Sequence, residues 1–271
     1  MLDSSMLGGI RAVILDMDGV IWRGGVPLPG LVTFFEFLHE RSLPFILATN
    51  NSTQSVASYV ERLARLGVQA TPDNIVTSAV ATAEYIRSAY GPDLRVHIVG
   101  EVGLYEAMLA AGFPPVMSDA DVVVVGLDTD LTYEKLRRAT YLIRSGARFI
   151  GTNDDRTFPM PDGLAPGTGS ILAALEASTG QQPLVIGKPE PVLFEMALAR
   201  LGTAPEQTLM VGDRLETDIL GAQRVGLRTV LVKTGVTSPE TLASSEIQPD
   251  LVFDDLGALR AAWTTVVQAL Q

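Results

Sequence analysis

The fold is decided by the stretch Val13-Ile14-Leu15-Asp16-Met17-Asp18-Gly19-Val20, in which an apolar run ends in two acids and a glycine. Residues two apart in an extended chain face the same way, so Asp16 and Asp18 project together from the carboxyl end of the strand. Open α/β sheets bind their ligands at that end. Two neighbouring carboxylates repel each other unless a cation or a proton separates them. A solvated turn would also explain such a stretch alone, so its meaning depends on the rest of the chain.

Similar apolar runs recur along the chain and alternate with segments of helical periodicity. Strands that are apolar throughout and separated by amphipathic helices are typical of parallel sheets covered on both faces. The predicted fold class is therefore α/β. The predicted strands are Ala12–Leu15, Pro44–Leu47, Val96–Val99, Val122–Val125, Phe149–Ile150, Leu184–Ile186, Leu209–Val211 and Thr229–Val232, and the predicted helices lie at about 30–41, 53–66, 101–111, 132–145, 169–179, 190–201, 215–225 and 255–270.

Composition excludes several classes of function. The formal net charge is −11 and no cluster of Lys and Arg is present, so we expect no nucleic-acid partner and no binding to anionic membranes. The chain has no cysteine, which removes disulfides, thiolate zinc sites and thiol nucleophiles. The first ten residues do not resemble a secretory signal, and no apolar run is long enough to span a bilayer. We therefore expect a cytoplasmic protein.

A second pair of acids follows the predicted strand Leu209–Val211. Asp213 lies just beyond this strand, and Asp218 lies five residues later, at the start of a predicted helix. An interaction with the helix dipole explains Asp218 well and Asp213 less well. Asp16, Asp213 and the backbone carbonyl of Asp18 would form an all-oxygen site. Magnesium (Mg²⁺) prefers such a site, with few carboxylates and with positions left for water and phosphate.

A run of small hydrogen-bonding side chains separates the second predicted strand from the helix that follows it. Capping this helix requires only one of them, either Ser52 or Thr53. The Thr49 hydroxyl, the side chains of Asn50 and Asn51, and the amides of the helix N-terminus remain as donors for phosphate oxygens. We therefore expect Thr49, Asn50 and Asn51 to bind phosphate.

Lys188 is the cation at the next junction of a strand and a helix, within Gly187-Lys188-Pro189. A lysine beside a proline is usually a solvated surface residue. At a strand end in this series, however, Lys188 can neutralise both Asp16 and a bound phosphate. Such a residue would explain how an acidic protein binds an anion.

Taken in order, the four segments resemble the four motifs of the haloacid dehalogenase (HAD) superfamily. The family pattern is Asp-x-Asp-Gly, then Ser/Thr with Asn, then Lys, then Gly-Asp-x-x-x-x-Asp. The chain also resembles the subfamily of p-nitrophenylphosphatase, phosphoglycolate phosphatase and NagD-type enzymes, through Asp-Gly-Val-Ile-Trp at 18–22, Thr-Asn-Asn-Ser at 49–52 and Gly-Lys-Pro at 187–189. One departure is Glu216, where the subfamily often has Asp.

The resemblance implies a Rossmann-like parallel-sheet core with an inserted α/β cap of the C2 type. The motifs fall within residues 1–80 and 183–271, so these segments are expected to form the core. Residues 81–182 carry none of the motifs and are expected to form the cap, which would select the substrate. Members of the subfamily often pair through the cap, so a homodimer is a further expectation.

The implied activity is Mg²⁺-dependent hydrolysis of small phosphate monoesters through an aspartyl-phosphate. Asp16 would be the nucleophile, and Lys188 would stabilise the phosphoryl oxygens. Asp18 would protonate the leaving alcohol and then deprotonate the attacking water. Asp213 would bind the metal, and the resemblance implies that Asp218 acts on it indirectly.

The expected cap contains two segments of less certain meaning. The polar run Asn153–Phe158 follows a predicted strand, and its residues Asn153, Arg156 and Phe158 are candidates for contacting the substrate. A surface turn would explain the same run. The Gly-rich segment 163–170 lacks the lysine and the spacing of nucleotide-binding loops, so we expect a loop in which Ser170 caps the next helix.

Two alternative functions stay open at this stage. A phosphotransferase or phosphomutase of the same superfamily would pass the phosphoryl group to an acceptor other than water. A receiver-like signalling module would retain its phosphoaspartate, although Asp18 and the large insertion argue against this alternative. A dehalogenase needs no Mg²⁺ and would not require Asp18. The physiological phosphate ester is not determined by these motifs.

Overall fold

The computed structural model describes residues 4–160 and 163–269, which form two compact units. Unit 1 comprises the described residues of Met1–Thr49, Val60–Val76 and Phe194–Gln271, and unit 2 comprises those of Asn50–Tyr59 and Thr77–Leu193. Residues 1–3 of the N-terminal segment and residue 270 of the last predicted helix lie outside the described residues. No helix within the described ranges combines the length and the apolar character needed to cross a membrane.

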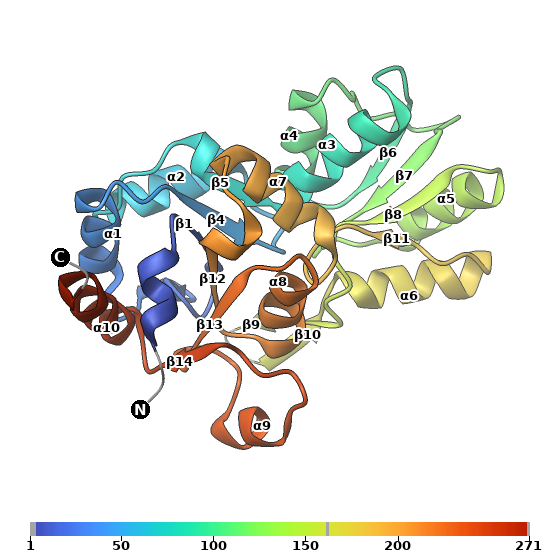
Figure 1. Ribbon diagram of the computed structural model, residues 1–271. Coiled ribbons are helices and arrows are strands. Elements are labelled where there is room, and N and C mark those ends of the chain that lie inside the picture. The colour runs from blue at the N-terminus through green and yellow to red at the C-terminus, as the bar shows by residue number, and fades with distance from the viewer. Residues whose placement is uncertain (1–3, 161–162, 270–271) are drawn as a thin grey trace. The chain divides into compact units, whose positions relative to one another are not determined.

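Unit 1 is built on a six-stranded sheet of order β14-β13-β12-β1-β4-β5 (Figure 1). All four residues of the central strand β1 are fully buried, as expected for a strand covered on both faces. It pairs in parallel with β12 on one side and β4 on the other. The strands are β1 Ala12–Leu15, β4 Phe45–Thr49, β5 Ile75–Thr77, β12 Thr208–Gly212, β13 Arg228–Val232 and β14 Leu251–Phe253.

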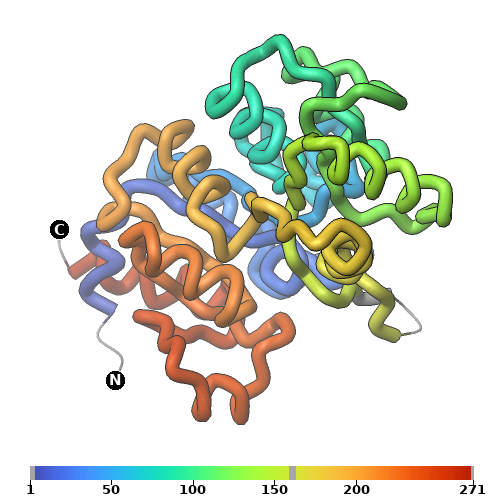
Figure 2. The backbone as a smooth tube through the Cα atoms, turned by 90° about the vertical axis from the view of Figure 1, so that its right-hand side faces the viewer, coloured from blue at the N-terminus to red at the C-terminus, as the bar shows by residue number. Residues whose placement is uncertain are grey.

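Two helices of unit 1, α1 (Leu31–Glu40) and α10 (Leu256–Ala269), pack against each other through aromatic side chains. The ring centroids of Phe37 and Trp263 lie 5.5 Å apart. Figures 1 and 2 both show the N-terminal 3₁₀ turn Ser4–Gly9 beside α10. The other elements of unit 1 are β2 Trp22–Arg23, β3 Val26–Pro27, the π-helical turn Leu215–Ile219, α8 Leu220–Arg224, α9 Pro239–Ser244 and the 3₁₀ turns Pro72–Asn74 and Pro205–Gln207. Two further helices, α2 Val56–Arg65 and α7 Pro191–Leu201, have residues in both units.

Unit 2 contains a parallel four-stranded sheet of order β11-β8-β7-β6. Val123 and Val125 of β7 join the apolar cluster formed with α5 and α6. Because side chains alternate along a strand, the buried Val122 and Val124 face the opposite side of the sheet. The elements are α3 Ser78–Tyr90, β6 Val96–Val99, α4 Val102–Ala110, β7 Val122–Val125, α5 Tyr133–Arg144, β8 Arg148–Gly151, β9 Thr157–Met160, β10 Gly163–Pro166, α6 Thr168–Thr179 and β11 Leu184–Val185.

The predicted α/β fold with parallel sheets is confirmed. Each of the eight predicted strands corresponds to a strand, within two residues at each end. The helix expected from residue 53 begins at Val56, because Ser55 rather than Ser52 or Thr53 caps it: the Ser58 amide donates to Ser55 Oγ at 3.2 Å. The helix expected at 215–225 is a π-helical turn followed by the short α8.

Sequence periodicity did not predict α3. Its buried face consists of Ala, Ser and Thr side chains and one Ile, so the apolar stripe that marks an amphipathic helix is weak. These small side chains allow α3 to pack closely against α4. The Thr77 hydroxyl caps α3 by accepting a hydrogen bond from the Val80 amide at 3.1 Å.

The Gly-rich segment 163–170 is not the loop that the sequence predicted. Its first part is β10, which pairs antiparallel with β9, and α6 begins at Thr168 after Gly167. Ser170 does not cap this helix, since its hydroxyl donates to the Arg156 carbonyl at 2.8 Å. The domain boundaries expected at 80/81 and 182/183 stay predictions. In the structure, β11 pairs with β8 of unit 2.

The packing of α1 on α10 gives a test of fold stability. Replacing the buried Trp263 by alanine should lower the free energy of unfolding by about 3 to 5 kcal/mol, because a large cavity is left against Phe37. The measurement is urea denaturation followed by circular dichroism. Val26→Ala, at a side chain that is 67% exposed, is the control and should shift the midpoint little. Equal shifts for both variants would contradict the packing described.

Candidate active site

The candidate site in unit 1 lies where neighbouring parallel strands end. Leu15 of β1 pairs with Val211 of β12, and the Asp16 amide donates to the Val211 carbonyl at 2.9 Å. Asp16 and Asp213 therefore leave the sheet at the same edge. Thr49 ends β4, on the other side of β1. After β1 the chain continues to β4 on one side of it and later returns to β12 on the other side. The strand order therefore reverses at β1, and sheets of this kind bind ligands at such a switch point.

Three carboxylates converge at this edge. Asp16, Asp213 and Asp218 each offer one oxygen, and these oxygens all lie within 4.8 Å of one another. The three residues are only 8%, 1% and 1% exposed. Buried carboxylates at this spacing repel each other unless positive charge or a proton is shared between them. An all-oxygen donor set fits a hard cation such as Mg²⁺.

The backbone around Asp213 is held by a second acid. Asp218 Oδ2 accepts hydrogen bonds from the backbone amides of Asp213 and Arg214, both at 3.1 Å. Asp218 lies in the π-helical turn, an irregularity often found at functional sites. Asp213 Oδ2 in turn accepts from the Val236 amide at 2.8 Å. Both acids are thus oriented by backbone amides.

Two glycines allow other loops to approach Asp213. Gly19 has a φ of +89°, and a side chain there would place its Cβ 2.5 Å from Asp213 Oδ2. A Cβ on Gly235 would also clash with this carboxylate. The contribution of Gly235 and Val236 was not predicted from the sequence. Their contribution could have been predicted, because Gly235 lies three residues beyond the predicted strand Thr229–Val232. The carboxyl ends of the parallel strands in this fold lie at the ligand site.

Asp18 lies outside the cluster of three acids and is exposed. The buried Trp22 donates a hydrogen bond from Nε1 to Asp18 Oδ1 at 3.0 Å. The Arg62 guanidinium stacks over the Trp22 ring at 3.8 Å from its centroid and also donates to the Gly24 carbonyl. The β2–β3 hairpin therefore fixes the orientation of the Asp18 carboxylate.

Asn50 and Lys188 contact each other in unit 2. Asn50 Oδ1 accepts from the Lys188 amide at 2.8 Å, and Asn50 Nδ2 donates to the Lys188 carbonyl at 2.9 Å. Lys188 is only 2% exposed. The neighbouring Asn51 makes a local turn, in which its Oδ1 accepts from the amide and the hydroxyl of Thr53 at 2.8 and 2.7 Å.

The three candidates in the polar run occupy different environments. Asn153 is buried, and its Nδ2 donates to the Asn50 carbonyl at 2.8 Å. Phe158 is partly buried and packs on the apolar cluster of unit 2. Arg156 is exposed. Their proposed contact with substrate stays a prediction.

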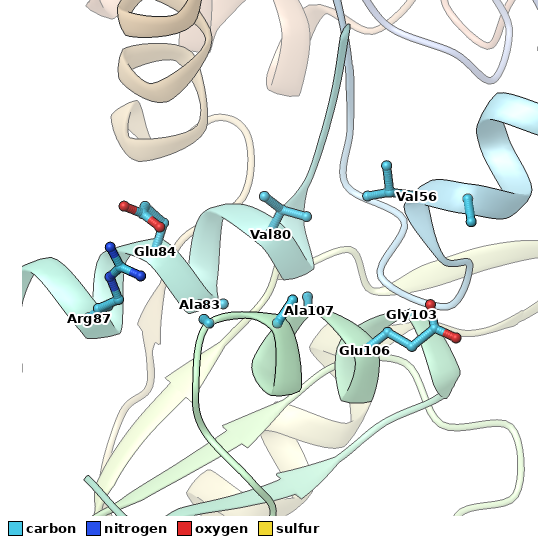
Figure 3. A pocket seen from close by; sticks show the side chains of 11 residues that line it. Val56, Val80, Ala83, Glu84, Arg87, Gly103, Glu106 and Ala107 are labelled. Atoms are coloured by element: carbon cyan, nitrogen blue, oxygen red, sulfur yellow. The ribbon is translucent and has the colours of Figure 1, made fainter. Parts of the chain in front are cut away.

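A cavity of about 320 Å³ in unit 2 contains none of the predicted site residues. Figure 3 shows Ala83 of α3 and Ala107 of α4 lining it, together with Glu84, Arg87 and Glu106. Its walls are otherwise formed by small apolar side chains. This cavity adds no chemical group to the candidate site.

Shifted pKa values also occur in the sheet of unit 2 and its loops. Burial lowers the pKa of His97, whose Nδ1 lies 2.7 Å from the Val116 carbonyl oxygen. Hydrogen bonds from Arg95 lower the pKa of Asp121 to about 2. Neither residue belongs to the cluster of three acids, so both shifts reflect local structure.

Comparison with protein families gives two matches to this chain. The haloacid dehalogenase-like hydrolase model matches residues 13–114, and the HAD-hydrolase-like model matches residues 185–259. The acid sugar phosphatase of Staphylococcus epidermidis is 40% identical over 248 residues, which cover 91% of this chain and 95% of that protein.

Solved structures agree with this relationship. The 4-nitrophenylphosphatase from Thermotoga maritima has a TM-score of 0.91 and 39% identity, covering 94% of this chain and 98% of that one. NagD from E. coli K-12 has a TM-score of 0.85 and 33% identity, covering 92% of this chain and 97% of that one. This chain therefore belongs to the haloacid dehalogenase-like hydrolases, within the subfamily of NagD and the p-nitrophenylphosphatases.

Proposed function

We propose that this protein hydrolyses small phosphate monoesters in a Mg²⁺-dependent reaction. The observation that carries the proposal is the convergence of Asp16, Asp213 and Asp218 within 4.8 Å at the switch point of the unit 1 sheet. The names of its relatives, acid sugar phosphatase and 4-nitrophenylphosphatase, support the same class of substrate. A sugar phosphate is accordingly the first class of ester to test.

Asp16, Asp213 and the backbone carbonyl of Asp18 would hold the Mg²⁺ ion. Asp218 would act on it indirectly, by fixing the Asp213 backbone through two amide hydrogen bonds. When bound, the ion supplies positive charge that offsets the repulsion among the carboxylates and the charge that develops on phosphoryl oxygens.

The Asp16 carboxylate would attack phosphorus, forming an aspartyl-phosphate as the bond to the leaving oxygen breaks. Asp18 would give its proton to that oxygen and then accept a proton from the water that hydrolyses the intermediate. The hydrogen bond from Trp22 supports this role, because it holds the Asp18 carboxyl in one orientation.

Thr49, Asn50, Asn51 and Lys188 are proposed to act on the phosphoryl group, as the family resemblance implies. Thr49 offers a hydroxyl at the end of β4, and Lys188 offers the positive charge. The side-chain oxygen of Asn51 accepts hydrogen bonds within its own loop, so its Nδ2 is the atom that would donate to phosphate.

Several finer expectations from the sequence also stay proposals. Residues 1–80 and 183–271 would form the catalytic core, and residues 81–182 a cap that selects the leaving group. Specificity would then come from the cap, since all monoesters share the phosphoryl group that the motifs bind. Pairing of two copies through the cap and a cytoplasmic location are further proposals.

The role of Asp16 is tested by Asp16→Asn. Turnover of a sugar phosphate or an aryl phosphate should fall on the order of 10⁴-fold or more, because an amide is not a nucleophile. Phosphate release is measured alongside circular dichroism, and Asp93→Asn, at an exposed acid of unit 2, is the control. Activity of Asp16→Asn within tenfold of the wild type would exclude Asp16 as the nucleophile.

Dependence on the metal is tested by removing it. Activity should disappear in excess chelator and return with added Mg²⁺. Calorimetry should detect Mg²⁺ binding to the wild type and much weaker binding to Asp213→Asn, because the variant loses one of the converging carboxylates. Full activity in excess chelator would contradict the proposed cofactor.

Asp18→Asn should separate the two half-reactions. An activated aryl ester needs little protonation of its leaving group, so the variant should form aspartyl-phosphate but hydrolyse it about 10² to 10⁴ times more slowly than the wild type. Intact-mass spectrometry should then detect a phosphorylated fraction. Hydrolysis of alkyl phosphates at the wild-type rate would rule out Asp18 as the acid and base.

A further inference from the structure

Lys188 lies where regular structure ends. The pairing of β11 with β8 continues through the Gly187 amide, which donates to the Thr152 carbonyl at 2.9 Å, and α7 begins only at Pro191. At Lys188 the backbone partner is instead the side chain of Asn50, which both accepts from the amide and donates to the carbonyl. The Asn50 side-chain amide thus takes the place of a peptide group of a neighbouring strand.

The hydrogen-bonding capacity of Asn50 is largely used by these contacts. An asparagine side chain has two N–H donors. One donates to the Lys188 carbonyl at 2.9 Å, and the Asp155 carboxylate lies 3.3 Å from the same nitrogen and accepts the other. Donation from Asn50 to a phosphate oxygen would therefore require one of these hydrogen bonds to break.

The surrounding chain holds Asn50 in this position. Its backbone carbonyl accepts from Ser78 Oγ at 2.6 Å and from Asn153 Nδ2 at 2.8 Å. A Cβ on Gly187 would lie 2.6 Å from Asn50 Oδ1, closer than real contacts allow. The glycine before Lys188 therefore permits the close approach of the Asn50 side chain.

We propose that Asn50 is a positioning residue that acts through Lys188. A lysine side chain is long and flexible, so the direction of its ammonium group depends on how firmly its backbone is held. The two hydrogen bonds from Asn50 fix the Lys188 backbone and thereby limit the directions that this buried side chain can take when it binds the phosphoryl group. The inference rests on the proposed function, in which Lys188 stabilises that group.

The test is a double-mutant cycle with Asn50→Ala and Lys188→Ala. In the wild-type background, Asn50→Ala should lower kcat/KM about 10²-fold, because small misplacements of a catalytic group have effects of this size. In the Lys188→Ala background, the same change should have an effect of less than about threefold, since the residue that it positions is gone. Inhibition by inorganic phosphate should weaken with the same non-additive pattern.

Asn74→Ala is the matched control. Asn74 is also a partly buried asparagine, and its side chain makes three hydrogen bonds, none of them with Lys188. It accepts from the Thr71 amide and hydroxyl at 2.9 and 3.0 Å and donates to the Phe45 carbonyl at 3.0 Å. Its loss should lower thermal stability and leave kcat/KM and phosphate inhibition unchanged. Asn50→Leu, which is similar in shape and uncharged but has neither donor nor acceptor, serves if Asn50→Ala does not fold, and it should show the same non-additivity.

The outcomes separate this inference from the proposed function. If Lys188→Ala keeps activity within about threefold of the wild type, the role proposed for Lys188 fails, whatever Asn50 does. If Lys188→Ala is strongly impaired and the two changes are additive, Lys188 keeps its role and Asn50 does not act through it. Wild-type activity and phosphate inhibition in the folded Asn50 variants would also overturn the inference.

Discussion

Repulsion among three buried carboxylates is the constraint to which the unit 1 site is adapted. Asp16, Asp213 and Asp218 lie within 4.8 Å of one another, where solvent does little to screen them. Strand register brings the first two together, backbone amides orient Asp213 and Asp218, and a glycine at position 19 leaves room for the Asp213 carboxylate. Such an arrangement requires a cation or a shared proton to offset the repulsion. The geometry of the site and the proposed metal dependence would therefore have the same physical origin.

Much of this site could be predicted because it lies at strand ends. The buried strands are short apolar runs, and the acids that follow them stand out in the sequence. What the sequence did not show is how the acids are held. The amides that orient Asp213 and Asp218 belong to the backbone, and the amide of Val236 belongs to a loop about twenty residues away along the chain. Every residue except proline has a backbone N–H, so the sequence does not reveal which residue donates to a carboxylate through its backbone.

The adjacent residues Asn50 and Asn51 illustrate the same limit. From the sequence, both residues were expected to bind phosphate. In the structure Asn51 hydrogen-bonds to Thr53 two residues away, whereas Asn50 hydrogen-bonds to Lys188, which is 138 residues away. The α3 helix was missed for a related reason, since its packing depends on small side chains whose value is visible only beside α4. Two identical neighbouring residues thus differ in role because the partner of one of them is remote in sequence.

The pairing of β11 with β8 has a consequence for recombining members of this family. Lys188 lies three residues beyond the end of β11, and its backbone is held by Asn50. The strand, the lysine and the asparagine therefore belong to unit 2. A chimera joined at 182/183 would take β11 and Lys188 from one parent and their sheet partner from the other. Exchanging 50–59 together with 77–193 would keep these contacts within a single parent. Such crossover points should preserve the hydrogen bonds that hold the Lys188 backbone, while the other residues of the exchanged segments differ between parents.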